Sequence, residues 1–307
     1  MPELPDVTVY VEHLAKRVVG ARALAVLVRG PNLLRTAEPP LADATGRSVL
    51  SVSRMGKRIV FGLSDERWLV LHLMIAGRLH WVDAGGRPRP AGKTTQAEFR
   101  FSSGTLTLTE AGTKKRASLH YVSGSAALAA LDPGGLEPLG SSVKVFSDRL
   151  LAGNHTLKRA LSDPRSFSGI GNAYSDEILH RARLSPLRLT RQLSPGEIAR
   201  LHDAVQVVLV EWTERLRTEA GSSFPTGVTA FREGMAVHGR YRQPCPVCAS
   251  PVQRIRYAAN EANYCATCQT GGRVLADRSL SRLLRDDWPR TVEEWEEVRP
   301  SGAVRKR

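Results

Sequence analysis

The chain has 307 residues, 42% of them hydrophobic, and its 44 lysines and arginines exceed its 30 acidic residues to give a formal net charge of +14. This length predicts about two globular domains, and so basic a chain attracts polyanions, which makes nucleic acid the expected partner. The sequence has no apolar run near the length of about 18 residues that a membrane helix needs, and no secretory signal. A membrane protein is therefore excluded, and a cytoplasmic protein is expected, associated with the nucleoid through DNA if the cell is bacterial.

The first residues of the chain, Met1 to Val7, carry a candidate nucleophile. Removal of Met1, which a small second residue permits, would leave Pro2 with a free secondary amine. An α-amino group has a pKa of about 7.7 to 8.0, so much of it is unprotonated near neutral pH and can attack carbon. Glu3 is placed to move protons during Schiff-base formation and β-elimination. Alternatively, these residues form an extended arm whose prolines delay the first helix.

The next 120 residues combine one helix with many short strands. Apolar residues spaced three and four apart from Val7 to Val18 predict a helix that opens at Asp6. Strand-like runs separated by turn signals follow at residues 48–53, 58–63, 68–75, 97–101 and 105–109. A helix plus an antiparallel β-sandwich is therefore expected to about residue 130.

From residue 131 onward the pattern becomes helical. Residues 131–140 are rich in glycine and proline and predict a linker. Helices are expected at 157–161 and 173–182, and a long helix begins at Ser194-Pro195-Gly196-Glu197, which is a capping box with proline at the first helical position. Gly221 ends that helix and opens a stretch, expected to be flexible, to about Arg232. The predicted fold class is α+β with several domains.

All four cysteines form two Cys-x-x-Cys pairs near the C-terminus: Cys245 with Cys248, and Cys265 with Cys268. Four thiolates at this spacing are typical of a closed, tetrahedral structural zinc site on two short strands joined by a turn. A redox-active dithiol or an iron–sulfur cluster is the alternative. The segment between the pairs carries Arg254 and Arg256, which suggests a finger that faces DNA.

Taken together, the motifs of the chain resemble the formamidopyrimidine-DNA glycosylase/endonuclease VIII family of base-excision repair enzymes, from Met1 to about Gln269. Five motifs carry the resemblance in the family's order: residues 1–7, Gly56-Lys57, His72-Leu73, residues 169–177 with the sequence GIGNAYSDE, and the cysteine pairs ending in Cys268-Gln269.

The resemblance implies a chemical role for the terminus. Pro2 would attack the sugar C1′ of a damaged nucleotide flipped out of the DNA, with Glu3 as its acid/base partner. Displacement of the base would leave an iminium, from which β- and δ-elimination cut the strand at the abasic site. The resemblance also implies one structural zinc ion, damaged double-stranded or single-stranded DNA as partner, and a monomer.

It further implies a set of DNA contacts. Lys57 and His72 would contact phosphates beside the lesion, and Lys158 and Asn172 would hold the kinked backbone from a helix-two-turn-helix motif. The residue types agree, because Gly169 and Gly171 permit a tight turn and Asn172 can cap the helix that follows. Simpler readings stay open: a helix-capping turn at 169–172, a solvated Lys57, and a hydrogen-bonded core histidine at position 72.

The chain departs from the family at several DNA-binding positions. Asn260 stands where the family has the finger arginine, and the loss of a charge-assisted contact costs roughly 1.5 to 3 kcal/mol unless Arg254, Arg256 or the basic tail replaces it. Residues expected to fill the space left by the flipped base are also unusual, with Met74 and Ile75 in one segment. In a second segment Lys114 lies at the position of a void-filling arginine and Arg116 at that of an intercalating aromatic residue.

The resemblance divides the chain into five parts. A catalytic β-sandwich domain is expected at 1–130, a linker at 131–140, a helix-two-turn-helix DNA-binding domain at 141–239, a zinc finger at 240–272, and a C-terminal extension at 273–307. In the extension, arginines 278, 282 and 285 at helical spacing and a capping box at 291–294 leave a docked helix pair and a mobile tail equally open.

Two functions of different classes follow. The first is an active DNA glycosylase with abasic-site lyase activity. The second, motivated by Asn260 and Arg116, is a catalytically weak or inactive protein of the same fold that binds damaged or unusual DNA. A zinc-finger transcription regulator would leave the N-terminal motif unexplained.

Overall fold

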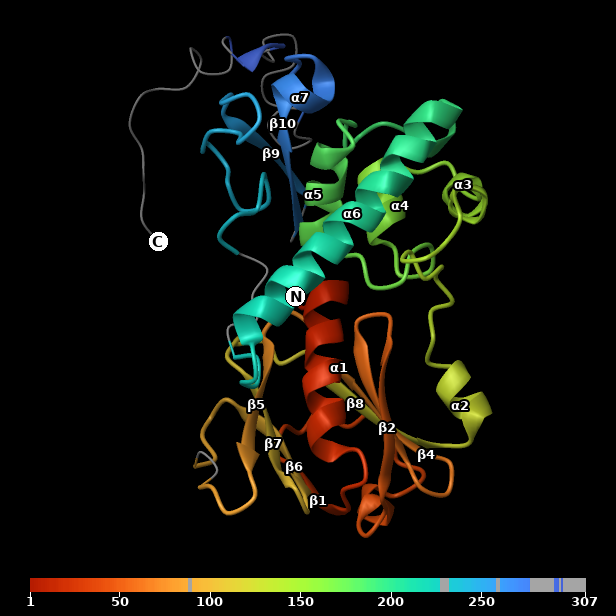
Figure 1. Ribbon diagram of the computed structural model, residues 1–307, viewed down its shortest axis with the longest axis vertical. Coiled ribbons are helices and arrows are strands. Elements are labelled where there is room, and N and C mark those ends of the chain that lie inside the picture. The colour runs from red at the N-terminus through yellow and green to blue at the C-terminus, as the bar shows by residue number, and fades with distance from the viewer. Residues whose placement is uncertain (88–89, 227–231, 258–259, 277–289, 293, 295–307) are drawn as a thin grey trace. The chain divides into compact units, whose positions relative to one another are not determined.

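A computed structural model of the chain describes all residues except 88–89, 227–231, 258–259, 277–289, 293 and 295–307 (Figure 1). Its contacts divide the chain into two compact units. The N-terminal unit comprises Met1–Glu137, Phe167–Ile170 and Leu209–Ala230, and the C-terminal unit comprises Pro138–Ser166, Gly171–Val208 and Phe231–Arg307. Among the described residues, no helix combines the length and the apolar character that crossing a membrane requires.

Two antiparallel four-stranded sheets form the N-terminal unit. One has the order β2 (Val49–Met55), β3 (Arg58–Leu63), β4 (Arg67–His72) and β8 (Ser118–Ser123). The other has the order β1 (Ala23–Val28), β6 (Thr95–Phe101), β7 (Gly104–Glu110) and β5 (Gly77–Asp83). The Phe61 ring of the first sheet stacks on Phe99 and Phe101 of the second, at centroid distances of 6.4 and 6.2 Å. The expected β-sandwich is therefore confirmed.

The strand expected at 68–75 ends earlier than the sequence suggests. β4 stops at His72 because Met74 adopts a left-handed backbone with φ of 52° and the Gly77 N–H donates to the Leu73 carbonyl. The apolar run that continues past His72 is therefore a turn that leads into β5.

Helix α1 (Leu4–Val18) begins two residues before the expected start. Glu3 precedes the first turn, and its backbone N–H donates to the Asp6 carboxylate over 2.9 Å. Asp6 therefore lies inside the helix and caps it by reaching back. The apolar face, with Val7, Leu14 and Val18 fully buried, packs against β2. A 3₁₀ turn (Leu41–Ala44) and a short helix α2 (Ser125–Ala129) complete this unit.

The C-terminal unit contains helices, a hairpin and a short last helix. Its elements are α3 (Val143–Leu151), α4 (Leu157–Ser162), α5 (Asn172–Arg181), a 3₁₀ turn (Thr190–Gln192), the first half of α6 (Pro195–Ala220), β9 (Val252–Tyr257), β10 (Asn260–Cys265) and α7 (Ala266–Thr270). The capping box of α6 is confirmed, since the Ser194 N–H donates to Glu197 over 2.9 Å and the Glu197 N–H donates to the Ser194 hydroxyl over 3.3 Å.

The described part of the C-terminal extension packs on the hairpin. Val274 and Val292 are buried with Ile255 and Tyr264 in one small core. The Leu275 N–H donates to the Tyr264 hydroxyl over 2.7 Å. Thr291 accepts a hydrogen bond from the Glu294 N–H, which is one half of the expected capping box. The arginines at 278, 282 and 285 and the last four residues, Val304-Arg305-Lys306-Arg307, lie outside the described residues.

Gly169 belongs to the N-terminal unit, although Ser166 and Gly171 on either side belong to the other. Its carbonyl accepts the Leu4 N–H over 2.9 Å, so it holds the backbone at the first residue of α1. Its φ is +79°, and an added Cβ would lie 2.8 Å from the Leu4 Cβ. Only glycine satisfies both the backbone angle and this close approach.

We expect Gly169→Ala to lower the free energy of unfolding by about 2 to 5 kcal/mol, combining left-handed strain with overpacking. Gly134→Ala is the matched control, because Gly134 has φ of +76° but no atom within 4 Å of an added Cβ. Gly134→Ala should lower the free energy of unfolding by about 1 to 2 kcal/mol, which is the effect of left-handed strain alone. Denaturant unfolding of both variants measures the difference, and equal losses would contradict the close approach.

Candidate active site and nucleic-acid interface

The candidate nucleophile lies at a buried chain terminus. Pro2 is buried and Glu3 is only 1% exposed, at the residue before α1. Burial lowers the pKa of the Met1 amino group, and the nearby cations Arg78 and Lys57 lower it further, whereas Glu3 and Asp6 act in the opposite direction. Burial therefore favours the neutral, nucleophilic form of a terminal amine in this place, and the opposing effect of the two carboxylates is partly offset by the two cations.

Lys57 and Arg78 approach this terminus from two turns. Lys57 follows Gly56, whose φ of +61° closes the tight turn between β2 and β3. Arg78, at the start of β5, donates to the carbonyls of Ile75 and Gly77 over 3.1 and 2.7 Å. The sequence alone did not single out Arg78, because an arginine in a strand-like run has no distinctive pattern.

His72 ends β4 beside Arg58 of β3 and Ser118 of β8. Burial lowers its pKa to about 4, and Arg58, Lys57 and His120 add to the shift. Its Nε2 is buried without a hydrogen-bond partner among the described residues. At neutral pH His72 is therefore uncharged, so any contact with a phosphate would come from a neutral imidazole N–H.

Two exposed segments carry the residues expected to fill the space of a flipped base. Met74 and Ile75 lie in the turn after β4, where the left-handed Met74 leaves Ile75 58% exposed. Lys114 and Arg116 are exposed in the loop after β7.

The buried side chain of Glu110 holds the loop after β7. The carboxylate is 1% exposed and accepts the backbone N–H groups of Arg116 over 2.8 Å and Ala117 over 3.3 Å. Lys115 turns back and donates to the Glu110 carbonyl. Glu110 therefore fixes the base of the loop that presents Lys114 and Arg116. An isolated acidic residue before a basic loop was the only signal for it in the sequence.

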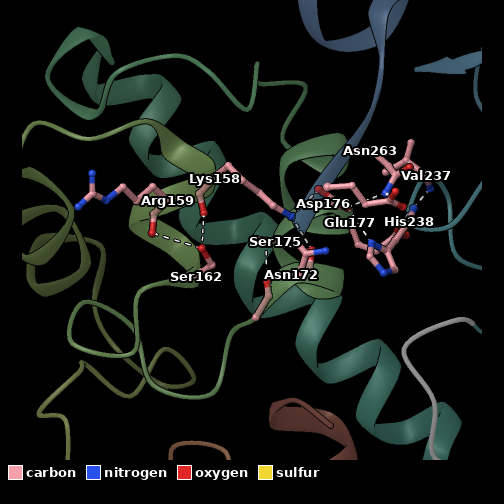
Figure 2. Close-up of polar contacts among 12 residues, drawn as sticks. Lys158, Arg159, Ser162, Asn172, Ser175, Asp176, Glu177, Val237, His238 and Asn263 are labelled. Atoms are coloured by element: carbon pink, nitrogen blue, oxygen red, sulfur yellow. Dashed lines mark hydrogen bonds and ion pairs between the residues drawn. The ribbon is translucent and has the colours of Figure 1, made fainter. Parts of the chain in front are cut away.

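In the C-terminal unit, Lys158 makes two short hydrogen bonds (Figure 2). Its ammonium group donates to the Asp176 carboxylate and to the Asn172 carbonyl, each over 2.5 Å. Asn172 is the first residue of α5, and Gly171 takes the capping position without a side-chain hydrogen bond. The expectation that Asn172 caps the helix is therefore wrong, because its backbone already has helical geometry.

Two adjacent carboxylates of α5 bind segments that are distant in sequence (Figure 2). Asp176, with no side-chain exposure, also lies 2.7 Å from His238 Nδ1 and accepts the Asn263 amide N–H over 3.3 Å. Glu177 accepts the backbone N–H groups of Ala236, Val237 and His238 over 2.7 to 2.9 Å. Neither role was predicted.

A cavity of about 720 Å³ lies within this unit, next to Lys158. Polar and apolar side chains both line it, namely Asn154, His155, Thr156, Lys158, Arg159, Ser162, Asn172, Leu187, Leu189, Glu261 and Ala276. Lys158 and Asn172, the two residues expected at one DNA contact, thus border the same space.

The four cysteine sulfur atoms lie within 4.8 Å of one another, at the open end of the hairpin where β9 begins and β10 ends. The Val247 N–H points at the Cys245 sulfur and the Cys268 N–H at the Cys265 sulfur, each over 3.5 Å. Backbone donors of this kind stabilise thiolates, so the donor set fits a bound metal ion. His180 of α5 adds a ring nitrogen 3.3 Å from the Cys245 sulfur.

The arginines of the finger differ in their surroundings. The Arg254 guanidinium lies 4.2 Å from the centre of the Tyr241 ring and 3.5 Å from the Glu261 carboxylate. Arg256 is exposed on the same strand. Asn260 starts β10, where it pairs with Tyr257, but its side chain lies outside the described part of the structure.

The chain combines a β-sandwich that has a buried N-terminal proline and glutamate with a helical unit that has a four-cysteine hairpin. These features define a helix-two-turn-helix class of nucleic-acid-binding fold. Residues 1–117 match the family model of the formamidopyrimidine-DNA glycosylase N-terminal domain, and residues 135–222 match that of its H2TH domain. The chain therefore belongs to the formamidopyrimidine-DNA glycosylase family.

Individual relatives agree with this assignment. The chain is 32% identical to the formamidopyrimidine-DNA glycosylase of Pelotomaculum thermopropionicum over 280 residues, which cover 88% of this chain and 99% of that protein. It is 43% identical over 137 residues to an uncharacterized formamidopyrimidine-DNA glycosylase-like protein of Mycobacterium tuberculosis, covering 44% of this chain and 85% of that one.

Solved structures show the same fold. The MutM (Fpg) protein of Thermus thermophilus is similar with a TM-score of 0.73 and 33% identity, covering 87% of this chain and 98% of that one. The Lactococcus lactis Fpg, solved in complex with DNA that contains an abasic site, gives a TM-score of 0.76 at 25% identity, covering 87% and 99%.

The pKa of His72 predicts a pH dependence of stability. As the pH falls below 6.5, the unfolded chain binds a proton at this residue, but the folded protein stays neutral there until about pH 4. This group should therefore lower the free energy of unfolding by about 2 kcal/mol when the pH falls from 7 to 5. Denaturant unfolding at both pH values should show a smaller loss of unfolding free energy for His72→Leu than for the wild type. Equal losses in variant and wild type would contradict the buried, neutral state.

Proposed function

We propose that the protein is a base-excision repair DNA glycosylase that also cleaves the strand at abasic sites. The observation that carries the proposal is the terminal amine, which lies buried beside Glu3 and within the fields of Lys57 and Arg78. Membership of the glycosylase family and the abasic-DNA complex of the Lactococcus lactis relative support it.

The chemistry follows from a secondary amine beside a carboxylate. After removal of Met1, the Pro2 nitrogen attacks C1′ of the damaged nucleotide, and the bond from C1′ to the base breaks as the base leaves with a proton. The Pro2 nitrogen loses its proton, and the sugar ring opens as the C1′–O4′ bond breaks and O4′ takes a proton, which leaves an iminium at C1′. This iminium makes the C2′ proton acidic. Loss of that proton expels the 3′ phosphate by β-elimination, and Glu3 accepts and returns protons. A further δ-elimination would release the 5′ phosphate.

Cationic and polar side chains of both units would hold the damaged DNA. Lys57, Lys114, Arg254 and Arg256 supply positive charge for phosphates. His72, Lys158, Asn172 and Asn260 would add hydrogen bonds of fixed direction. Met74, Ile75 and Arg116 would occupy the space that the flipped base leaves. We infer that the protein works as a monomer on double-stranded or single-stranded damaged DNA.

We also infer that one zinc ion binds the four cysteines. Four thiolates leave no open coordination position, so this zinc would stabilise the β9–β10 hairpin and supply no step of the reaction.

A second candidate is a DNA-damage-binding protein of the same fold with little or no catalysis. Asn260 in place of the finger arginine, and Arg116 in place of an aromatic wedge, favour it. This protein would bind abasic or gapped DNA without forming a covalent intermediate.

The free Pro2 nitrogen can be tested with a removable block. A protein that carries a cleavable peptide before Pro2 should give no borohydride-trapped adduct with abasic DNA, because the nitrogen is then an amide. Proteolytic exposure of Pro2 should restore the adduct, and Glu3→Gln should form it about 100-fold or more slowly. Mass spectrometry verifies the terminus, and the affinity for abasic DNA is measured for each form of the protein. Tight binding without an adduct after exposure would favour the second candidate.

Metal removal tests the zinc assignment. The protein as purified should contain one zinc per chain, and chelation should unfold the hairpin and weaken DNA binding because the metal supplies its folding energy. The β-sandwich should keep its unfolding transition, since its core shares no residue with the cysteine cluster. Unchanged DNA affinity after verified metal removal would show that the hairpin does not depend on the ion.

A further inference from the structure

Asp176 joins three separate segments of the C-terminal unit through one buried carboxylate (Figure 2). It receives Lys158 from α4, His238 from the segment before the first cysteine pair, and Asn263 from β10. Its side chain has no exposure, so its charge is compensated by these donors and not by water.

The Lys158 ammonium group is directed by this arrangement. An ammonium has three N–H donors, and two are committed to Asp176 and to the Asn172 carbonyl. The side chain is 11% exposed and borders the 720 Å³ cavity, so the third donor has a restricted direction. Its positive charge is already balanced by Asp176.

We propose that Asp176 is a positioning residue of the DNA site, which holds Lys158 as an oriented, charge-balanced hydrogen-bond donor for one DNA phosphate. The inference rests on the proposed DNA-binding function. A lysine paired in this way contributes direction and little charge, so it should release few counterions when DNA binds, unlike an exposed lysine.

The salt dependence of binding separates this role from a structural one. The probe is a duplex with a tetrahydrofuran abasic analogue, which cannot be cleaved. Lys158→Met and Asp176→Asn should each weaken binding about tenfold at moderate salt, because each removes the oriented contact. The double variant should also lose about tenfold and not a hundredfold, because both substitutions remove the same oriented contact.

The slope of log affinity against log salt gives the deciding readout. Lys158→Met should leave the slope unchanged, whereas Asp176→Asn should steepen it by up to about 0.9, the value for one phosphate contact, because the freed lysine becomes an ordinary cation. The double variant should return the slope to that of wild type. A purely structural Asp176 would not produce the steepening, and a slope reduced by about 0.9 in Lys158→Met would overturn the proposal.

Controls separate this inference from unfolding and from the proposed function. Lys144 and Asp148 form an ion pair of the same chemistry on α3, with side chains 84% and 65% exposed, so Asp148→Asn should not reproduce the combination of weaker binding and steeper slope. Where a single variant is unstable, the double variant, which leaves no buried unpaired charge, still reports slope and affinity. Zinc content verifies the finger in each protein.

If the wild-type protein fails to bind the abasic duplex, the proposed function fails. If it binds but the effects of the two substitutions on affinity add to about a hundredfold, only the inference fails.

Discussion

Burial of two neighbouring carboxylates on one helix is the constraint on which the C-terminal unit depends. A buried carboxylate is costly unless donors surround it. Asp176 obtains them from α4, β10 and His238, and Glu177 obtains them from the backbone at 236–238. Because these donors come from segments that share no local structure, the helix, the approach to the cysteine cluster and the hairpin are held in one arrangement.

In the N-terminal unit, buried carboxylates also accept hydrogen bonds, here from backbone N–H groups at the start of α1 and in the loop after β7. Asp6 accepts the N–H of Glu3, and Glu110 accepts those of Arg116 and Ala117. Each bond fixes backbone next to a candidate functional residue, so the positions of the terminus and of the loop after β7 depend on buried acids. In a chain of net charge +14, these few buried acids hold the backbone beside the candidate functional residues.

Local signals made part of this architecture predictable. Three motifs could be recognised in this way: the Cys-x-x-Cys pairs, the capping box at Ser194 and the residues at the terminus. Within each motif the residues are only a few positions apart, so the sequence alone indicates its role. The partners of Asp176 lie 18, 62 and 87 residues away, and no local pattern encodes such contacts. Helix α3 was missed for a related reason, since Val143 and Val145 are exposed and blur its apolar stripe.

The cations of the chain divide into two groups by their surroundings, and this bears on the missing finger arginine. Lys158 is paired with Asp176, whose side chain has no exposure, and Arg254 lies 3.5 Å from the Glu261 carboxylate, so both cations have an acidic partner. Lys114, Arg116 and Arg256 are exposed and add to the long-range field. Asn260 stands at the position of the finger arginine, and an amide carries no charge but can donate a hydrogen bond. In the function that we propose, the attraction of DNA and its orientation would therefore rest on different side chains, and one could vary without loss of the other.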